Sequence, residues 1–175
     1  MPEDHAKPAA PGMPPADMHL LGAIVAQAPD ALIFADRLGI VRVWNRGAEA
    51  LFGYSAAETL GGSLDLIIPE RFRRAHWEGF RKAIETGRTK HAREVLTTRS
   101  MHKDGSTLYI DLSFGLIRDQ DGTVAGALAV GRDCSARHRA ERALRARLAE
   151  LEHGGNEAAE AGARPSAASV IRQDR

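Results

Sequence analysis

One histidine stands at a position where the sequence predicts an apolar, inward-facing side chain. The stretch LIIPERFRRAHWEGF, residues 66–80, reads as a helix that begins at Pro69, because proline is favoured in the first turn of a helix. Residues three and four apart share one helix face, so Phe72, His76 and Phe80 form a single stripe. Most charged residues of the stretch fall on the opposite face.

A histidine between two phenylalanines has two explanations. The commoner one is an imidazole at the edge of the core, where its polar side meets water or a backbone carbonyl. The other is a binding function, for which the chain must supply a surface facing this helix. In STLYIDLSFGLIRD, residues 106–119, apolar residues recur with a period of two, which predicts a strand with one apolar face.

The elements around this strand predict an α+β domain. Five strands are expected, joined by tight turns such as HKDG and DQDG, and helices lie between the second and the third strand. The strands are expected at residues 31–36, 39–45, 91–102, 106–119 and 123–133. The pattern therefore predicts a five-stranded antiparallel sheet with helices across one face.

A separate amphipathic helix is expected at residues 135–153. Leu144, Leu148 and Leu151 follow each other at spacings of four and three, which makes an apolar seam on one face. A helix of this length is marginal alone, so we expect the seam to pair with a second copy in a homodimer, the alternative being that it packs back on the domain. Gly154 and Gly155 are expected to end the helix.

The two ends of the chain differ in composition from the middle. Residues 1–17 are rich in proline and alanine and are expected to form a disordered arm, and residues 154–175 a disordered tail. The folded domain is expected over residues 18–134. No segment has the order of a secretion signal or the length of a membrane span, so we expect a cytoplasmic protein that does not bind a membrane.

Composition excludes several functions. The formal charge of the 175-residue chain is +1, from 24 basic and 23 acidic side chains, so no field of one sign favours nucleic acid. Cys134 is the single cysteine, which excludes an internal disulfide and a cysteine-rich zinc site. The chain has no catalytic motif for a nucleophile or a phosphate-binding loop, and an enzyme is not expected.

The order of these elements resembles that of a PAS domain, the small sensor module of bacterial signalling proteins. The matching segments are APDALIFAD, GIVRVWNRGAEALFGYSAAETLGG, LIIPE, HKDGSTLYIDLSFGLIRDQDG and GRDCSARHRAE. Together they cover roughly residues 18 to 140, and they are specific as a set although each is weak alone. The resemblance implies a PAS fold followed by a C-terminal signalling helix.

Within this family the sequence is most similar to the haem-binding PAS domains of FixL-type oxygen sensors. Their iron ligand is a histidine on the long helix, seven residues after the proline that opens it, and Pro69 and His76 have this separation. The resemblance therefore implies b-type haem with His76 as the iron ligand. The residues expected around the haem are Phe72, Phe80, Leu96, Leu112 and Phe114.

One position departs from the haem sensors. They carry a gas-binding arginine or an iron-binding methionine on the strand before HKDG, whereas this chain has Leu96 and Glu94 at the corresponding positions. Only a bulge in the strand would let Arg93, Arg99 or His91 replace that arginine. Selectivity for oxygen is therefore not implied.

Two functions follow from the sequence. The first is a stand-alone sensory PAS protein that binds haem and passes its ligand state, through the C-terminal helix, to a homodimer partner, a separate histidine kinase or another signalling protein. The alternative is a cofactor-free PAS module for dimerisation or docking, or one that binds another small apolar ligand. Flavin is not expected, because the reactive cysteine motif of the flavin-binding relatives is missing.

Overall fold

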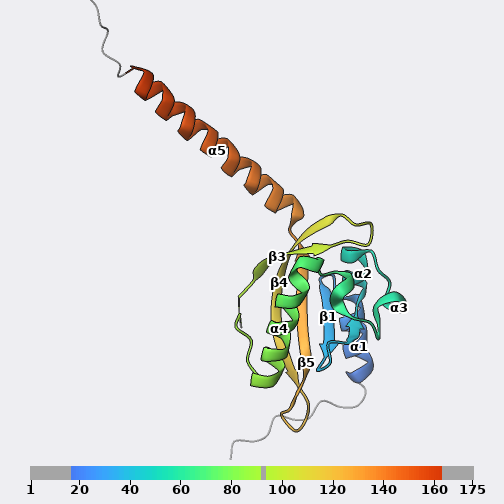
Figure 1. Cartoon of the computed structure of the whole chain (residues 1–175). Helices are drawn as coiled ribbons and strands as arrows, with labels where there is room; N and C mark the ends of the chain where they lie inside the picture. The colour runs from blue at the N-terminus through green and yellow to red at the C-terminus, as the bar shows by residue number, and fades with distance from the viewer. Residues whose placement is uncertain (1–16, 92–93, 163–175) are drawn as a thin grey trace, which may run out of the picture. The chain divides into compact units, whose positions relative to one another are not determined.

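The sheet has five antiparallel strands, as the sequence predicted (Figure 1), and their spatial order is β2-β1-β5-β4-β3. The computed structural model describes residues 17–91 and 94–162. The strands are β1 (Ala31–Asp36), β2 (Val41–Trp44), β3 (Leu96–Met101), β4 (Thr107–Arg118) and β5 (Val124–Asp133). The central strand β5 pairs with β1 on one side and with β4 on the other.

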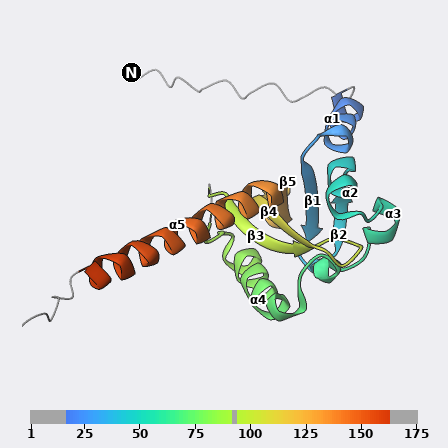
Figure 2. The ribbon, with the colours of Figure 1, turned by 90° about the horizontal axis from the view of Figure 1, so that it is seen from above.

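The helices between β2 and β3 cover one face of this sheet (Figure 2). They are α2 (Arg46–Phe52), α3 (Ala56–Thr59), the 3-10 turn η1 (Leu64–Leu66) and α4 (Glu70–Thr86). Helix α1 (Asp17–Gln27) precedes the sheet, and α5 (Ser135–Gly162) follows it. The chain divides into two compact units, one up to Cys134 and one from Ser135.

The core lies between the helical segment and the sheet. Ile33 of β1, Phe52 of α2 and Ile110 of β4 are buried together with Ile67 and Ile68, which precede α4. Burial of these apolar side chains is the main force that holds the helices against the sheet.

Asn45 joins α1 and α2 to the sheet. Its side-chain oxygen accepts hydrogen bonds from the backbone N–H groups of Leu32 and Ala48, at 2.8 and 2.9 Å, and the second of these caps α2. Its amide nitrogen donates to the carbonyl oxygens of Val25, Ala28 and Asp30, at 3.1, 3.2 and 3.0 Å. One buried side chain therefore fixes the end of α1 and the start of α2.

Two predicted boundaries were wrong. Strand β3 begins at Leu96, not at residue 91, because His91 and Glu94 close a turn through a backbone hydrogen bond and a contact between their side chains. Helix α5 continues through Gly154 and Gly155 to Gly162, where a disordered tail was predicted, since the alanines and glutamates that follow are good helix formers.

The predicted end of the N-terminal arm also differs from the structure. Asp17 is the first residue of α1 and not the last of an arm, and the rest of the predicted arm, together with residues 163–175, lies outside the described residues. Among the helices that the structure describes, none is long and apolar enough to cross a membrane.

Candidate functional site

Helix α4 is fixed at its start by side chains that reach back to η1. The Arg73 guanidinium donates to the carbonyl oxygens of Ile68, at 3.1 Å, and Asp65, at 2.9 Å. The indole N–H of Trp77 donates to the Asp65 carboxylate at 2.7 Å. These bonds hold the helix over the sheet, and His76 lies within the same turns.

A cavity of about 460 Å³ lies between α4 and the sheet. Apolar side chains make up most of its wall, with His76 among them. The lining residues are Ile33, Phe52, Leu64, Ile67, Ile68, Phe72, Ala75, His76, Thr98, Arg99, Ser100, Leu112, Phe114 and Ala129.

The sheet leaves space for this cavity because β5 has small residues on its inner face. Ala129 pairs with Ile33 of β1 and with Phe114 of β4, so these three side chains point to the same face. Gly131 occupies the equivalent place beside Leu112, and an added Cβ there would lie 2.7 Å from a Leu112 methyl carbon. Small residues in the central strand thus create the hollow, a feature that the sequence analysis missed.

His76 has a buried ring nitrogen without a hydrogen-bond partner. Its Nε2 is buried, and no residue in the described part of the chain bonds to it. The ring meets Trp77 edge-on at 4.9 Å and stacks on Phe80 at 6.4 Å between centroids. Burial lowers the pKa of His76 below its ordinary value of 6.5, and the charge of Asp65 offsets part of this shift. The imidazole is therefore neutral near pH 7, with one nitrogen left to bind.

A second cavity of about 300 Å³ adjoins the first and shares Ala75, His76 and Phe114 with it. Its remaining lining residues are Gly79, Phe80, Ala83, Thr89, Lys90, His91, Gly115, Leu116 and Ala127. The Thr89 hydroxyl oxygen is also buried and lacks a hydrogen-bond partner within the described ranges. His76 thus lines two adjacent cavities, with Lys90 in the wall of the smaller one.

The predicted site residues do not all meet. Phe72, Leu112 and Phe114 line the larger cavity with His76, and Phe80 lines only the smaller one. Leu96 lines neither cavity, although it lies on the inner face of β3, opposite Leu112.

Of the residues that might have replaced the arginine of the haem sensors, the structure describes Arg99 and His91, and neither directs a charge into the larger cavity. Arg99 belongs to the lining, but its guanidinium donates to the Thr107 hydroxyl at 3.0 Å, on the outer face of the sheet. The register of β3 with β4 runs without a shift from Leu96 to Met101, so no bulge re-aims this residue. His91 contacts Glu94 at 2.8 Å, and Arg93 lies outside the described residues.

Two hydroxyl groups occupy the sheet wall instead. Thr98 and Ser100 alternate with Arg99 along β3 and line the larger cavity, and Ser100 is only 7% exposed. The Thr98 hydroxyl makes one long hydrogen bond, 3.4 Å, to the carbonyl oxygen of Ile110. Because residues two apart in a strand share one face, the position of Leu96 in the sequence could have identified both residues as inward-facing. Strand β3 therefore adds two uncharged hydroxyl groups to an otherwise largely apolar wall.

These residues fit a haem group. Haem needs a neutral imidazole with a free nitrogen, an apolar slot that excludes water, and a cation for its propionates. His76 offers the imidazole, Phe72, Leu112 and Phe114 offer an apolar wall, and Lys90 offers a cation. In the part of the chain that the structure describes, no cluster of three or more histidine, cysteine or acidic residues could hold a bare metal ion.

The family model of the PAS fold matches residues 20–134, and the chain belongs to this family. PAS domains are sensory modules that are typical of signal transduction proteins. The fold and the cavity between α4 and the sheet place this chain in that class.

The chain is similar to two curated sensor proteins. It is 30% identical over 96 residues to Sensor protein FixL of Bradyrhizobium diazoefficiens, which covers 54% of the chain and 19% of that protein. It is 27% identical over 140 residues to Oxygen sensor protein DosP of Escherichia coli K12, which covers 80% of the chain and 16% of that protein. The chain spans 19% of the length of FixL, 16% of the length of DosP and 12% of the length of a third curated relative, an uncharacterised protein of Azorhizobium caulinodans.

Solved structures show the same fold. A PAS domain from Colwellia psychrerythraea has a TM-score of 0.59 and 23% identity, covering 68% of this chain and 98% of that one. An RNA-binding light-oxygen-voltage receptor has a TM-score of 0.62 and 24% identity, covering 86% of this chain and 42% of that one. At these identities the likeness concerns the fold alone.

Proposed function

We propose that the chain is a sensory module that binds haem b in the cavity between α4 and the sheet, with His76 as the iron ligand. The observation that carries the proposal is the buried, unpartnered Nε2 of His76, because burying a polar atom without a partner costs free energy that a bound ligand would recover. Similarity to FixL and to the oxygen sensor DosP supports the same assignment.

Each part of the cavity has a role in this proposal. His76 holds the iron, and Phe72, Leu112 and Phe114 keep water out of the slot. Lys90, at the smaller cavity, neutralises a propionate. When bound, the haem supplies an iron that takes up a small gas or changes its oxidation state. Thr98 and Ser100 offer hydroxyl groups to whatever enters beside it.

The signal leaves the domain along β5. This strand carries Ala129 in the cavity wall and ends at Asp133, two residues before α5 begins at Ser135. A ligand that favours one arrangement of the sheet would thereby act on α5 and on its partner, a second copy or a separate cytoplasmic kinase or other signalling protein.

Absorption spectroscopy tests the haem assignment. Purified protein is incubated with haem, reduced and exposed to carbon monoxide, beside His76→Ala and the matched control His91→Ala, which removes the histidine of the adjoining cavity. We expect a sharp Soret band that shifts with the gas in wild type and His91→Ala and collapses in His76→Ala. The same weak, broad spectrum in all three, with unchanged circular dichroism, would reject His76 as the ligand.

A second candidate function is a PAS module that binds another small, uncharged ligand. The uncharged hydroxyl wall and the neutral imidazole favour it, because they offer hydrogen bonds without a counter-charge. Native mass spectrometry of colourless protein distinguishes the two candidates, since a co-purified ligand adds a discrete mass that Ala129→Phe, which narrows the cavity, should remove.

A further inference from the structure

A separate pocket of about 400 Å³ lies between α4 and the turn that joins β1 to β2, and we call it the arginine pocket. Phe80 of α4 belongs to its wall and also lines the smaller of the two cavities beside His76. The other wall residues considered below are Arg37, Gly39, Ile40, Ser63, Trp77 and Arg81.

Buried and hydrogen-bonded groups fix the shape of the arginine pocket. Gly39 is buried at a φ of 79°, and an added Cβ there would overlap the Trp77 ring, so the turn and the helix are in close contact. The Asp36 carboxylate accepts hydrogen bonds from the backbone N–H groups of Leu38 and Ile40, both at 3.0 Å. The turn is therefore held in one conformation against α4.

Two arginines line this pocket without a counter-charge. Within the described residues, Arg37 and Arg81 make no hydrogen bond and no ion pair. The carboxylates of Asp36 and Asp65 are already bound, to Arg42 and to an indole N–H, both at 2.7 Å. A guanidinium is always charged, so two of them at one pocket repel each other. An anion between them would replace this repulsion by attraction.

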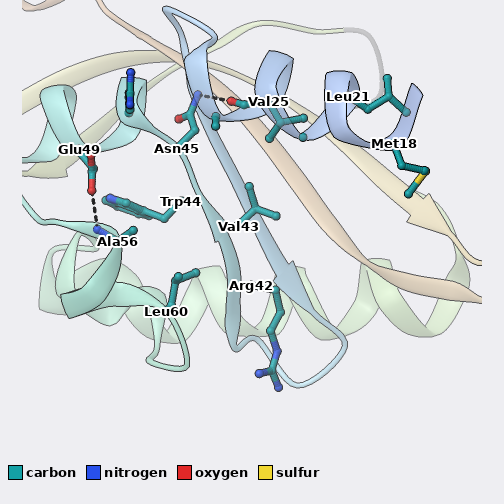
Figure 3. Close-up of a pocket in the computed structure, with 13 residues that line it drawn as sticks. Met18, Leu21, Val25, Arg42, Val43, Trp44, Asn45, Glu49, Ala56 and Leu60 are labelled. Atoms are coloured by element: carbon teal, nitrogen blue, oxygen red, sulfur yellow. Dashed lines mark hydrogen bonds between the residues drawn. The ribbon is translucent and has the colours of Figure 1, made fainter. Parts of the chain in front are cut away.

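A third arginine near this turn has a different environment. Arg42 lines the groove between α1 and β2, and Figure 3 shows it there together with the apolar side chains of α1. Its guanidinium is paired with Asp36 at 2.7 Å. Unmatched positive charge is therefore a property of the arginine pocket and not of every arginine beside β2.

The remaining wall of the arginine pocket is mostly apolar. Trp77 and Phe80 meet edge to face, with ring centroids 5.5 Å apart, and Ile40 adds an aliphatic side chain. The Ser63 hydroxyl accepts a hydrogen bond from the Asp65 N–H at 3.2 Å, which leaves its own hydrogen to donate. A bare inorganic anion would leave both rings in water, whereas a ligand with an aromatic body would cover them.

We propose that the arginine pocket binds an aromatic carboxylate. The carboxylate lies between Arg37 and Arg81, because the fork of a guanidinium matches the two oxygens of a carboxylate, and the ring packs on Trp77 and Phe80. This site goes beyond the proposed function and does not depend on haem. Its occupant contacts Phe80, a side chain that the pocket shares with the cavity beside His76.

Nuclear magnetic resonance tests this proposal by titration of the full chain with benzoate, without added haem. The chain has two tryptophans, so Trp77→Phe assigns the two indole N–H signals. Benzoate should shift the Trp77 signal to saturation and leave that of Trp44, which donates to the Tyr54 carbonyl in the core, unchanged. Benzamide has the ring without the charge and inorganic phosphate the charge without the ring, so both should bind at least about tenfold more weakly.

Two variants locate the bound benzoate. Arg37→Gln and Arg81→Gln should each weaken binding about tenfold, since each removes a charge-assisted hydrogen bond. Lys82→Gln is the matched control, because Lys82 is an exposed cation of α4 that does not line the pocket, and it should leave binding unchanged. In the described structure Arg37 lines neither cavity beside His76, so its variant distinguishes this pocket from them.

Three results would overturn the proposal. They are a Trp77 signal that benzoate does not shift, benzoate binding that both arginine variants keep at wild-type strength, and benzamide or phosphate that binds as tightly as benzoate. None of these results bears on His76, whose role the absorption spectrum tests separately.

Discussion

At the scale of single residues, His76 is unusual because its half-buried ring has a buried nitrogen, Nε2, without a hydrogen-bond partner in the described structure. Phe80 and Trp77 hold the ring in place, and burial keeps it neutral. A neutral, fixed imidazole is the form that binds a metal or donates one hydrogen bond.

The lowered pKa of His76 predicts how stability depends on pH. The unfolded chain takes up a proton near the ordinary pKa of 6.5, whereas the folded chain resists it to a lower pH. The free energy of unfolding should therefore fall as the pH drops through about 6.5, until the folded-state pKa is passed. Urea unfolding at several pH values should show this fall in wild type and a smaller one in His76→Leu. Equal slopes would contradict it.

Replacing Ala129 by a larger residue should stabilise the fold and weaken ligand binding. Ala129→Val fills part of the cavity from the central strand and should raise the free energy of unfolding by about 0.5–1 kcal/mol, as cavity-filling changes commonly do. It should also reduce haem uptake, which spectroscopic titration measures.

The control is Ser113→Val, on the outer face of β4. Like Ala129→Val, this variant introduces a valine into a strand, but it does not fill the cavity. Haem uptake should therefore be unchanged. Undiminished uptake in Ala129→Val would show that the ligand does not occupy this space.

At the scale of elements, Asn45 connects three segments through five hydrogen bonds. Asn45→Ala should lower the free energy of unfolding by about 2 kcal/mol or more, because it removes a helix cap and leaves buried backbone groups unpaired. Chemical denaturation measures the loss. Gln27→Ala, an exposed amide in α1, should change stability by less than about 0.5 kcal/mol.

The sequence predicted the helices and strands better than it predicted the cavity between α4 and the sheet. Strand β4 was predicted from its alternation, and α4 from Pro69 and its apolar stripe, because each signal is local to its segment. The cavity depends on Ala129 facing both Ile33 and Phe114, a relation between three strands that no local pattern contains. The sequence likewise does not show that Leu96 lies beyond both cavities, since counting along a strand does not reveal how far a cavity extends.

At the scale of the whole molecule, the exposed leucines of α5 are the second large apolar surface besides α1. Leu144, Leu148 and Leu151 are all exposed in the structure. In otherwise wild-type protein, Leu148→Glu should weaken self-association, because it places a charge in the seam, and should leave the unfolding of the domain unchanged. Light scattering and thermal unfolding measure the two effects, and an unchanged dimer would reject the seam.

The register of β3 has a consequence for how this cavity could change. Thr98 and Ser100 face inward only because their strand pairs with β4 without an irregularity, and Arg99 is turned outward by the same pairing. A single-residue insertion in the turn between β3 and β4 that shifts this pairing by one position would exchange the two sets and turn a guanidinium toward the cavity. A cavity wall of hydroxyl groups and one that carries a guanidinium are therefore one insertion apart, with no substitution required.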